Sequence, residues 1–346
     1  MGRPSDRNQK SVLRRRWFSR SVAVLLLSSA LTSTSALARG VDLPVSCRTI
    51  ENFAVGATTK TFGKLEFLGG ITFSSSDKLL GAMSAIRFRP DGEGFVSVLD
   101  TGHWMTGRVV RDDAGHLSCL EGLRATSMLN AEGEDENVKY QMDAEGLAIG
   151  DGELLVSYEQ FHRVDAYPDP DFADARPLRS LPIPFPLSEL RGNRGLETLA
   201  IAPADSRLGR VPVVVAERSI DGNDDLYAAI LDGPMKGEFR VKRNDPWDVT
   251  DGAFLPDGDL LLLERRFRLS DGVGMRIRRI SGADIAPGAV VDGETLIDVD
   301  LSHQIDNMEG LDVVTGADGV TRIVVVSDDN HSILQRNLML EFRIAE

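Results

Sequence analysis

The sequence lacks the short motifs that identify several classes of enzyme. It contains no Gly-x-Ser-x-Gly elbow of serine hydrolases, no His-Glu-x-x-His zinc helix and no Arg-His-Gly string of histidine phosphatases. It also has no Cys-x-x-Cys pair and no phosphate-binding glycine loop. The sequence therefore has no local signature of these mechanisms.

Cysteine and histidine are both scarce. The two cysteines, Cys47 and Cys119, can form one disulfide in an oxidising compartment, but their spacing does not decide whether they do. Of the five histidines, His103 and His331 lie in polar loops and are candidate bases. His103 is also a candidate substrate-binding residue, although a lone loop histidine is more often simply solvated.

Acidic residues greatly outnumber basic residues outside the N-terminus. The chain carries a net charge of −14, and residues 1–38 carry +6, which leaves −20 on the remainder. Such a surface repels nucleic acid and anionic lipid, so we expect no nucleic-acid partner. The acidity favours divalent cations, with calcium as the candidate cofactor, or serves solubility alone.

The apolar run of the N-terminus, Val22 to Leu31, is too short to span a bilayer. It follows Arg15-Arg16-Trp17-Phe18 and precedes the small-x-small sequence Ala36-Leu37-Ala38, a combination that resembles a twin-arginine signal peptide over residues 1–38. An ordinary secretory signal is the alternative. Both predict a mature chain that begins near Arg39 in the periplasm or outside the cell, without an integral membrane span.

A strand-turn-strand pattern recurs through the mature chain. A small or acidic residue opens an alternating apolar strand, a turn follows, and a second strand rich in Val and Leu ends in an acid. The repeats begin at residues 84, 145, 197, 251 and 309. Turns such as Asp91-Gly92, Asp151-Gly152 and Asp257-Gly258 are typical hairpin signals. A period of 52–61 residues with this content predicts an all-β propeller.

The number of blades depends on the segments outside these repeats. Phe67–Phe73 and Met339–Arg343 both have strand patterns, and they either pair to close the ring or supply a further blade. We expect a propeller of six blades, with five as the alternative, over residues 62–346. Residues 39–61 are expected to be an N-terminal lead-in.

The openers of the repeats are the strongest candidate site residues. Four are acids, Glu145, Glu197, Asp251 and Glu309, and the fifth is Ser84. Residues at one position of every repeat converge on the propeller axis, where like charges must take up protons, pair with arginine or share a cation. We therefore expect these four acids to be catalytic, and Glu145, Glu197 and Glu309, with Asp328, to hold a metal ion. The alternative is that each acid bonds to the turn of its own blade.

A second set of acids closes the repeats, and arginine often follows it. These acids are Asp100, Glu159, Glu217, Glu264 and Asp328. Acids beside arginines are more often structural ion pairs than catalysts. Arginines near the axis can also hold a phosphate or carboxylate, and the candidates are Arg87, Arg194 and Arg265. We expect Arg265 to be catalytic, and Arg87, Arg194 and Asn330 to bind substrate.

Several strings together resemble the phytase-like family, described as "esterase-like activity of phytase", over residues 62–344. They are Asp143-Ala-Glu145-Gly146, Asn193-Arg-Gly195-Leu-Glu197, Leu263-Glu264-Arg265, Asp306-Asn307-Met-Glu309-Gly310 and Ser327-Asp328-Asp-Asn330, followed by Gln335 and Phe342. The first glycine-rich strand departs from the family pattern, since it reads Gly81-Ala-Met-Ser84-Ala85. The resemblance implies a propeller outside the cytoplasm and hydrolysis of an ester or phosphoester.

Three functions follow from these observations. The first is metal-assisted hydrolysis of a small phosphoester or other ester, in which a carboxylate takes up the proton. The second is a non-catalytic binding propeller of the cell envelope, whose acids are structural. The third is a calcium-dependent enzyme similar to lactonases.

Overall fold

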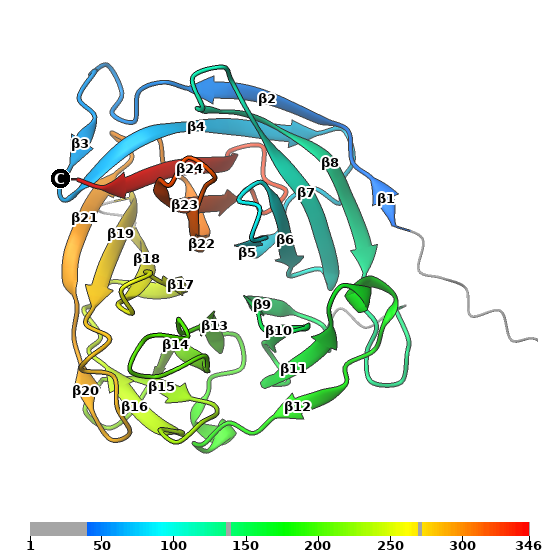
Figure 1. Cartoon of the computed structure of the whole chain (residues 1–346), viewed down its shortest axis with the longest axis vertical. Helices are drawn as coiled ribbons and strands as arrows, with labels where there is room; N and C mark the ends of the chain where they lie inside the picture. The colour runs from blue at the N-terminus through cyan, green and yellow to red at the C-terminus, as the bar shows by residue number, and fades with distance from the viewer. Residues whose placement is uncertain (1–39, 136–139, 269–271, 346) are drawn as a thin grey trace, which may run out of the picture. The chain divides into compact units, whose positions relative to one another are not determined.

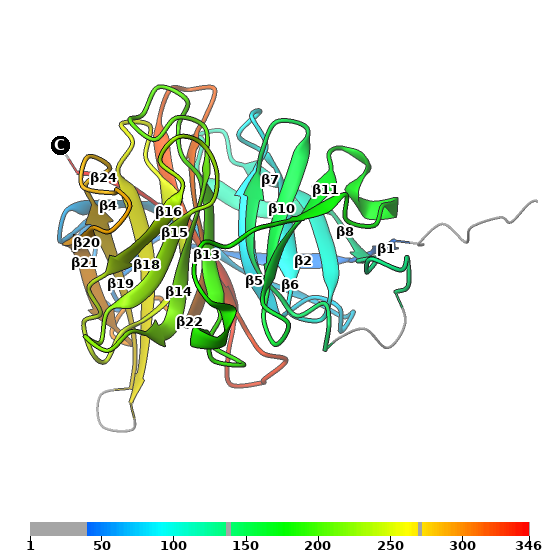
Figure 2. The same cartoon turned by 90° about the horizontal axis from the view of Figure 1, so that it is seen from below.

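The apolar repeats form short strands that are buried on both faces, because each sheet packs between two others. The computed structural model describes residues 40–135, 140–268 and 272–345, and the signal peptide expected over residues 1–38 lies outside them. The described residues form five sheets around one axis (Figure 1). Figure 2 shows the ring from the side. The predicted all-β propeller is confirmed.

Each sheet begins with the strand nearest the axis and continues outward. Blade I contains β5 (Met83–Phe88), β6 (Gly94–Leu99), β7 (His103–Arg111), β8 (Leu117–Ser127) and β1 (Val41–Asp42). Blade II contains β9 (Ala144–Ile149), β10 (Glu153–Tyr158), β11 (Arg163–Pro168) and β12 (Arg179–Leu181). Blade III contains β13 (Leu196–Ile201), β14 (Pro212–Ile220), β15 (Leu226–Ile230), β16 (Gly237–Val241) and β20 (Val290–Val291).

The last two blades complete the ring. Blade IV contains β17 (Asp248–Phe254), β18 (Leu260–Arg268), β19 (Gly272–Ile280) and β21 (Glu294–Asp300). Blade V contains β22 (Asn307–Thr315), β23 (Thr321–Asp328), β24 (Asn337–Ile344), β4 (Leu65–Ser75) and β2 (Val45–Ile50), with β3 (Thr61–Phe62) paired to β4. Two short 3₁₀ helices, η1 (Asp171–Asp174) and η2 (Leu187–Glu189), lie in the connections. No helix of the described residues has the length and apolar character needed to cross a membrane.

Blade V joins the two ends of the described chain. Strand β4 pairs antiparallel with β24, so that Gly70 lies opposite Leu340. The two segments that were candidates for a further blade thus pair within one blade, and the ring has five blades, the smaller of the two expected numbers. Residues 39–61, the expected lead-in, contain β1 and β2, which extend the outer edges of blades I and V.

A disulfide reinforces this closure. Cys47 on β2 and Cys119 on β8 are bonded, with their Cα atoms 5.3 Å apart and a sequence separation of 72 residues. The bond connects the outer strands of blades V and I, where the ring closes. A cross-link over a loop of this length typically stabilises a fold by about 2–4 kcal/mol, largely by restricting the unfolded chain.

The core is divided among the contacts between blades. Five clusters of buried apolar side chains occur in the described residues, and each cluster draws from two neighbouring blades. Between blades IV and V, for example, Leu261 and Leu263 belong to the same cluster as Leu340 and Phe342. Burying one such side chain contributes about 1.5–3 kcal/mol. The blades are thereby held in fixed positions, and so are the ends of their inner strands.

Candidate active site

A β-bulge interrupts the innermost strand of every blade near its first residue. In blade III, Leu196 pairs with Ala216 and Thr198 with Val215, which leaves Glu197 as the extra residue. Bulges re-aim side chains in this way beside functional sites. The residues at this position in the five blades are Ser84, Glu145, Glu197, Thr250 and Glu309.

The second strand of each blade contributes a residue beside the bulge. In blade II, Tyr158 pairs with Ala144, and the next residue, Glu159, donates its backbone N–H to the carbonyl of Asp143 at 2.8 Å. The residues at this position in the five blades are Asp100, Glu159, Glu217, Arg265 and Asp328. Blade IV therefore supplies an arginine where the other four blades supply an acid.

All members of these two sets except Thr250 line a polar cavity of about 270 Å³, here called the acidic cavity. It is lined by Met83, Ser84, Asp100, Glu145, Glu159, Asn193, Glu197, Glu217, Arg265, Asn307, Glu309, Asp328 and Asn330. Seven of the lining residues are carboxylic acids and one is a cation. This excess of like charge in a small space is the main electrostatic feature of the site.

Arg265 is the cation of the acidic cavity, and it contacts acids from two neighbouring blades. Its Nη1 donates to the Asn307 side-chain oxygen at 2.8 Å and to the Glu309 carboxylate, and its Nη2 lies 3.5 Å from Glu217 Oε1. Burial alone would lower the pKa of Arg265, but Glu309 and Glu217 raise it well above its ordinary value. Arg265 therefore stays charged and fixed between blades III and V.

The carboxylic acids of the cavity resist ionisation. Burial, together with repulsion from neighbouring acids, raises the pKa of Glu145 and Glu197 well above the ordinary value. The same causes raise the pKa of Glu159 to about 7. Burial also raises the pKa of Glu309 to about 7, although Arg265 opposes the shift. A divalent cation bound among the ionised acids would relieve this repulsion without protonation of the carboxylates.

Two carboxylate triads at the acidic cavity have the spacing of a metal site. Asp143, Glu145 and Glu159 form one, and Glu159, Glu197 and Glu217 form the other, with one oxygen of each acid within 4.8 Å of the others in its triad. Oxygens bound to one calcium ion at about 2.3–2.6 Å lie at most about 5 Å apart. Oxygen donors alone suit calcium or magnesium rather than zinc, which prefers His and Cys. The donor set therefore fits the expected calcium.

The structure does not place Asp251 in the ring of acids. Because the bulge in blade IV falls at Thr250, Asp251 lies one position beyond it. Asp251 is completely buried and accepts two hydrogen bonds from Arg87, at 2.7 and 2.8 Å. Arg87 also donates to the carbonyls of Leu199, Gly252 and Leu311 at 2.8–3.0 Å. Arg87 was expected to bind substrate, and Asp251 was expected to be catalytic. Instead, the two residues form an ion pair that joins blades I and IV across the axis.

The other predicted residues are distributed over three places. Asn330 and Asp328 line the acidic cavity, and Asp328 Oδ1 accepts the backbone N–H groups of Ala82 and Asn330 at 2.5 and 2.9 Å. His103 is not among the lining residues, and its Nδ1 lies 3.0 Å from the Thr101 carbonyl oxygen. Arg194 lies in a neighbouring cleft, 3.4 Å from Glu217.

That cleft, here called the arginine cleft, has a volume of about 700 Å³. Its lining includes Arg194, Arg218, Arg265, Arg266 and Arg268, together with the acids Glu217, Asp245, Asp248 and Asp306. Glu217, Arg265 and Asn307 line the acidic cavity as well. An acidic, cation-suited cavity and an arginine-rich cleft are therefore contiguous at the ends of the same strands.

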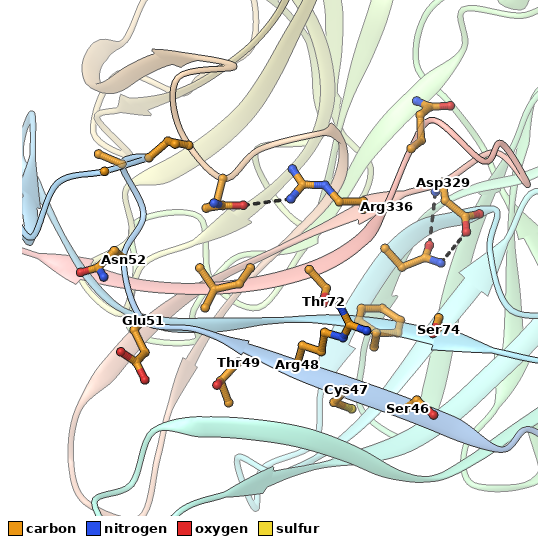
Figure 3. A pocket seen from close by; sticks show the side chains of 18 residues that line it. Ser46, Cys47, Arg48, Thr49, Glu51, Asn52, Thr72, Ser74, Asp329 and Arg336 are labelled. Atoms are coloured by element: carbon orange, nitrogen blue, oxygen red, sulfur yellow. Dashed lines mark hydrogen bonds between the residues drawn. The ribbon is translucent and has the colours of Figure 1, made fainter.

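A larger cavity, of about 790 Å³, lies away from these acids along β2 (Figure 3). Arg48, Thr49 and Glu51 lie on one side of it, and Asp329 and Arg336 on the other. Its side chains include neither a carboxylate triad nor a ring position from the inner strands. Size alone therefore does not identify the functional site, and we assign that role to the acidic cavity.

Comparison with known proteins agrees with this geometry. The profile of a family described as "Phytase-like: Esterase-like activity of phytase" matches residues 78–331, which contain all five inner strands. The chain belongs to the phytase-like family. No curated protein has significant similarity to the chain.

Among solved structures, this phytase-like chain is similar to one titled "Crystal structure of RRP9 WD40 repeats", at 9% sequence identity and a TM-score of 0.41. The alignment covers 82% of this chain and 99% of that chain. The propeller assignment rests on the five sheets themselves. The family description supports hydrolysis of an ester as the class of activity.

Several residues of the site of this phytase-like domain were not predicted from the sequence. Glu159 and Glu217 were not among the predicted site residues, yet they form the second triad with Glu197. Glu217 also forms ion pairs with Arg194 and Arg265, as expected for an acid of this set. Asn193 and Asn307 also line the acidic cavity. The signal that could have found the acids was their common position at the end of the second strand of each repeat.

The raised pKa values predict how the stability of the calcium-free protein depends on pH. Glu159 and Glu309 each have an ordinary pKa of 4.5, which rises to about 7 in the fold. The folded protein then binds more protons than the unfolded chain between these values, so its stability falls as pH rises from 4.5 to 7. Calorimetry in chelator should show the melting temperature fall by roughly 5 °C over this window. Saturating calcium should flatten the decline, and a melting temperature that rises with pH would contradict the assignment.

Proposed function

We propose that this phytase-like propeller hydrolyses phosphate esters with the help of a divalent cation, calcium by preference, held in the acidic cavity. The observation that carries the proposal is the pair of carboxylate triads that share Glu159. Their oxygen donors, their spacing and the raised pKa values of Glu145, Glu159 and Glu197 all favour cation binding.

The arginine cleft supports an anionic substrate. Arg265 takes part in both the acidic cavity and the cleft, so a phosphate held by arginine there would lie beside the triads. Guanidinium groups bind phosphate oxygens in bidentate geometry, which positions the ester as well as neutralising it.

The triads, Glu309 and Arg265 would each have a separate role in the reaction. The triads hold the cation, which when bound polarises the phosphate ester and lowers the pKa of a water molecule. Glu309 accepts a proton from the attacking water, because its pKa of about 7 suits a general base at neutral pH. Arg265, in contact with Glu309, stabilises the negative charge that develops on the phosphoryl oxygens.

Export from the cytoplasm is part of the proposal. A disulfide between Cys47 and Cys119 is stable in an oxidising compartment, where free calcium is also plentiful enough to fill weak sites. The expected twin-arginine-like signal over residues 1–38 agrees with such a location.

An assay of three substrate classes tests the proposed function. Purified protein would be offered a nitrophenyl phosphate, a nitrophenyl acetate and a simple lactone, each with calcium and with chelator. We expect phosphate release that falls at least about 100-fold in chelator and returns with calcium. Equal turnover in chelator would contradict the proposal. Lactone hydrolysis that exceeds phosphate release would favour the lactonase-like alternative, and calcium binding without any turnover would favour a binding propeller.

A further inference from the structure

The rim of the arginine cleft carries an unusual concentration of exposed apolar side chains. Ile333, Leu334 and Phe267 are 100%, 87% and 74% exposed, the three highest values among the large apolar residues of the described chain. Leu334 and Phe267 line the cleft, as does Leu301, which is 55% exposed. Single exposed apolar residues are ordinary, but a group of them around one concave site indicates binding.

Two segments of the chain carry these exposed side chains. Phe267 lies near the end of the β18–β19 hairpin, opposite Val273. The Leu301 side chain lies beside Gly272 of the same hairpin. Leu334 follows a tight turn in which its backbone N–H donates to Ser332 Oγ at 3.2 Å. The apolar rim is therefore built by two segments, one from blade IV and one from the loop after β23.

The lining of the arginine cleft contains five arginines and four acids. Asp248 lies 3.5 Å from Arg218, 3.6 Å from Arg243 and 3.7 Å from Arg194. Arg194 also lies 3.4 Å from Glu217, and Arg243 lies 2.8 Å from Asp245. Arg194 and Arg218 are about one-third exposed and face the cleft. Positive charge thus remains available to an anion that enters between them.

We propose that the arginine cleft binds an amphiphilic phosphate ester, with the phosphate at Arg194 and Arg218 and an apolar chain along Phe267, Leu301 and Leu334. The inference rests on the proposed function for where the ester is cleaved, but binding in the cleft does not require turnover. It specifies a substrate class with a single anionic head and an alkyl or acyl tail, because a highly charged polar ligand would leave the apolar rim in water.

A series of alkyl phosphates tests the inference by calorimetry, without any catalytic readout. Butyl, hexyl and octyl phosphate would be titrated below their micelle concentrations into calcium-free protein. We expect the dissociation constant to fall about twofold for each added methylene, or about 15-fold from butyl to octyl, which corresponds to half-burial of each methylene. In the double variant Phe267→Ser/Leu334→Ser, the dissociation constants of butyl and octyl phosphate should differ less than threefold. Both positions are exposed, so the fold should not depend on them.

Matched controls separate the tail from the head. Leu178→Ser removes a similarly exposed leucine outside the cleft and should keep the full dependence on chain length. Arg218→Gln should weaken every member of the series by a similar factor, whereas Arg210→Gln, at an exposed arginine outside the cleft, should not. Equal affinity for all chain lengths would overturn the inference. So would binding to phosphatidylglycerol vesicles without monomer binding, which would instead indicate a membrane-docking surface. Failure of the ester assay alone would leave the chain-length result intact.

Discussion

Glu197→Gln is expected to abolish calcium-dependent turnover, with kcat/KM at least about 100-fold lower, and to reduce the rise in melting temperature that calcium causes. Glu197 is buried, occupies the bulge position of blade III and shares a triad with Glu159 and Glu217. Glutamine keeps the shape of the side chain but removes a charged oxygen ligand. The loss should therefore fall on cation affinity rather than on folding.

The calcium-free protein should respond in the opposite direction. At pH 8, where more of the cavity acids are ionised, removing one carboxylate relieves repulsion on its neighbours, so the variant should melt a few degrees above the wild type in chelator. Glu153→Gln is the matched control, because Glu153 is paired with Arg179 away from the cavity. A Glu197→Gln protein that retains full calcium-dependent turnover would contradict the assignment of the second triad.

Arg87→Met is expected to destabilise the fold by about 3–5 kcal/mol, the largest effect on stability that we predict. The substitution leaves Asp251 as a buried charge without its guanidinium partner, and four backbone carbonyls lose a donor. Burial raises the pKa of Asp251, while Arg87 opposes the shift. Without Arg87 the acid would have to fold in the protonated state. Chemical denaturation at pH 7 measures the loss.

The double variant Arg87→Met/Asp251→Leu should recover most of this stability, because apolar residues of similar volume often replace a buried ion pair without loss. Both variants should retain the calcium-induced rise in melting temperature, since neither Arg87 nor Asp251 lines the acidic cavity. An Arg87→Met protein within about 1 kcal/mol of the wild type would show that the pair does not hold the blades together. If calcium no longer stabilised the folded double variant, the pair would instead be part of the cation site.

The difference between Asp251 and Glu197 shows where sequence reasoning reached its limit. Both open an apolar strand, and the repeat pattern aligns them. The bulge in blade IV falls one residue earlier, at Thr250, so the same pattern places Asp251 one position beyond the ring. Because of this shift, Arg265 rather than Glu264 occupies the cavity-lining position on the second strand. Glu264 is buried and accepts hydrogen bonds from Arg276 and Arg278. A pattern with a period of two residues cannot reveal an irregularity of one residue.

Local sequence patterns were sufficient to predict the repeat, the propeller and most of the acids that meet at the axis. Alternating apolar residues and Asp-Gly turns specify local hairpins, and a hairpin repeated at similar spacing can bury its faces only against its own copies. Four other features emerge only in the closed ring: the number of blades, the disulfide between Cys47 and Cys119, the ion pair of Arg87 with Asp251, and the grouping of Glu159 with Glu197 and Glu217. These features depend on distances between residues far apart in the chain, which are fixed only when the ring closes.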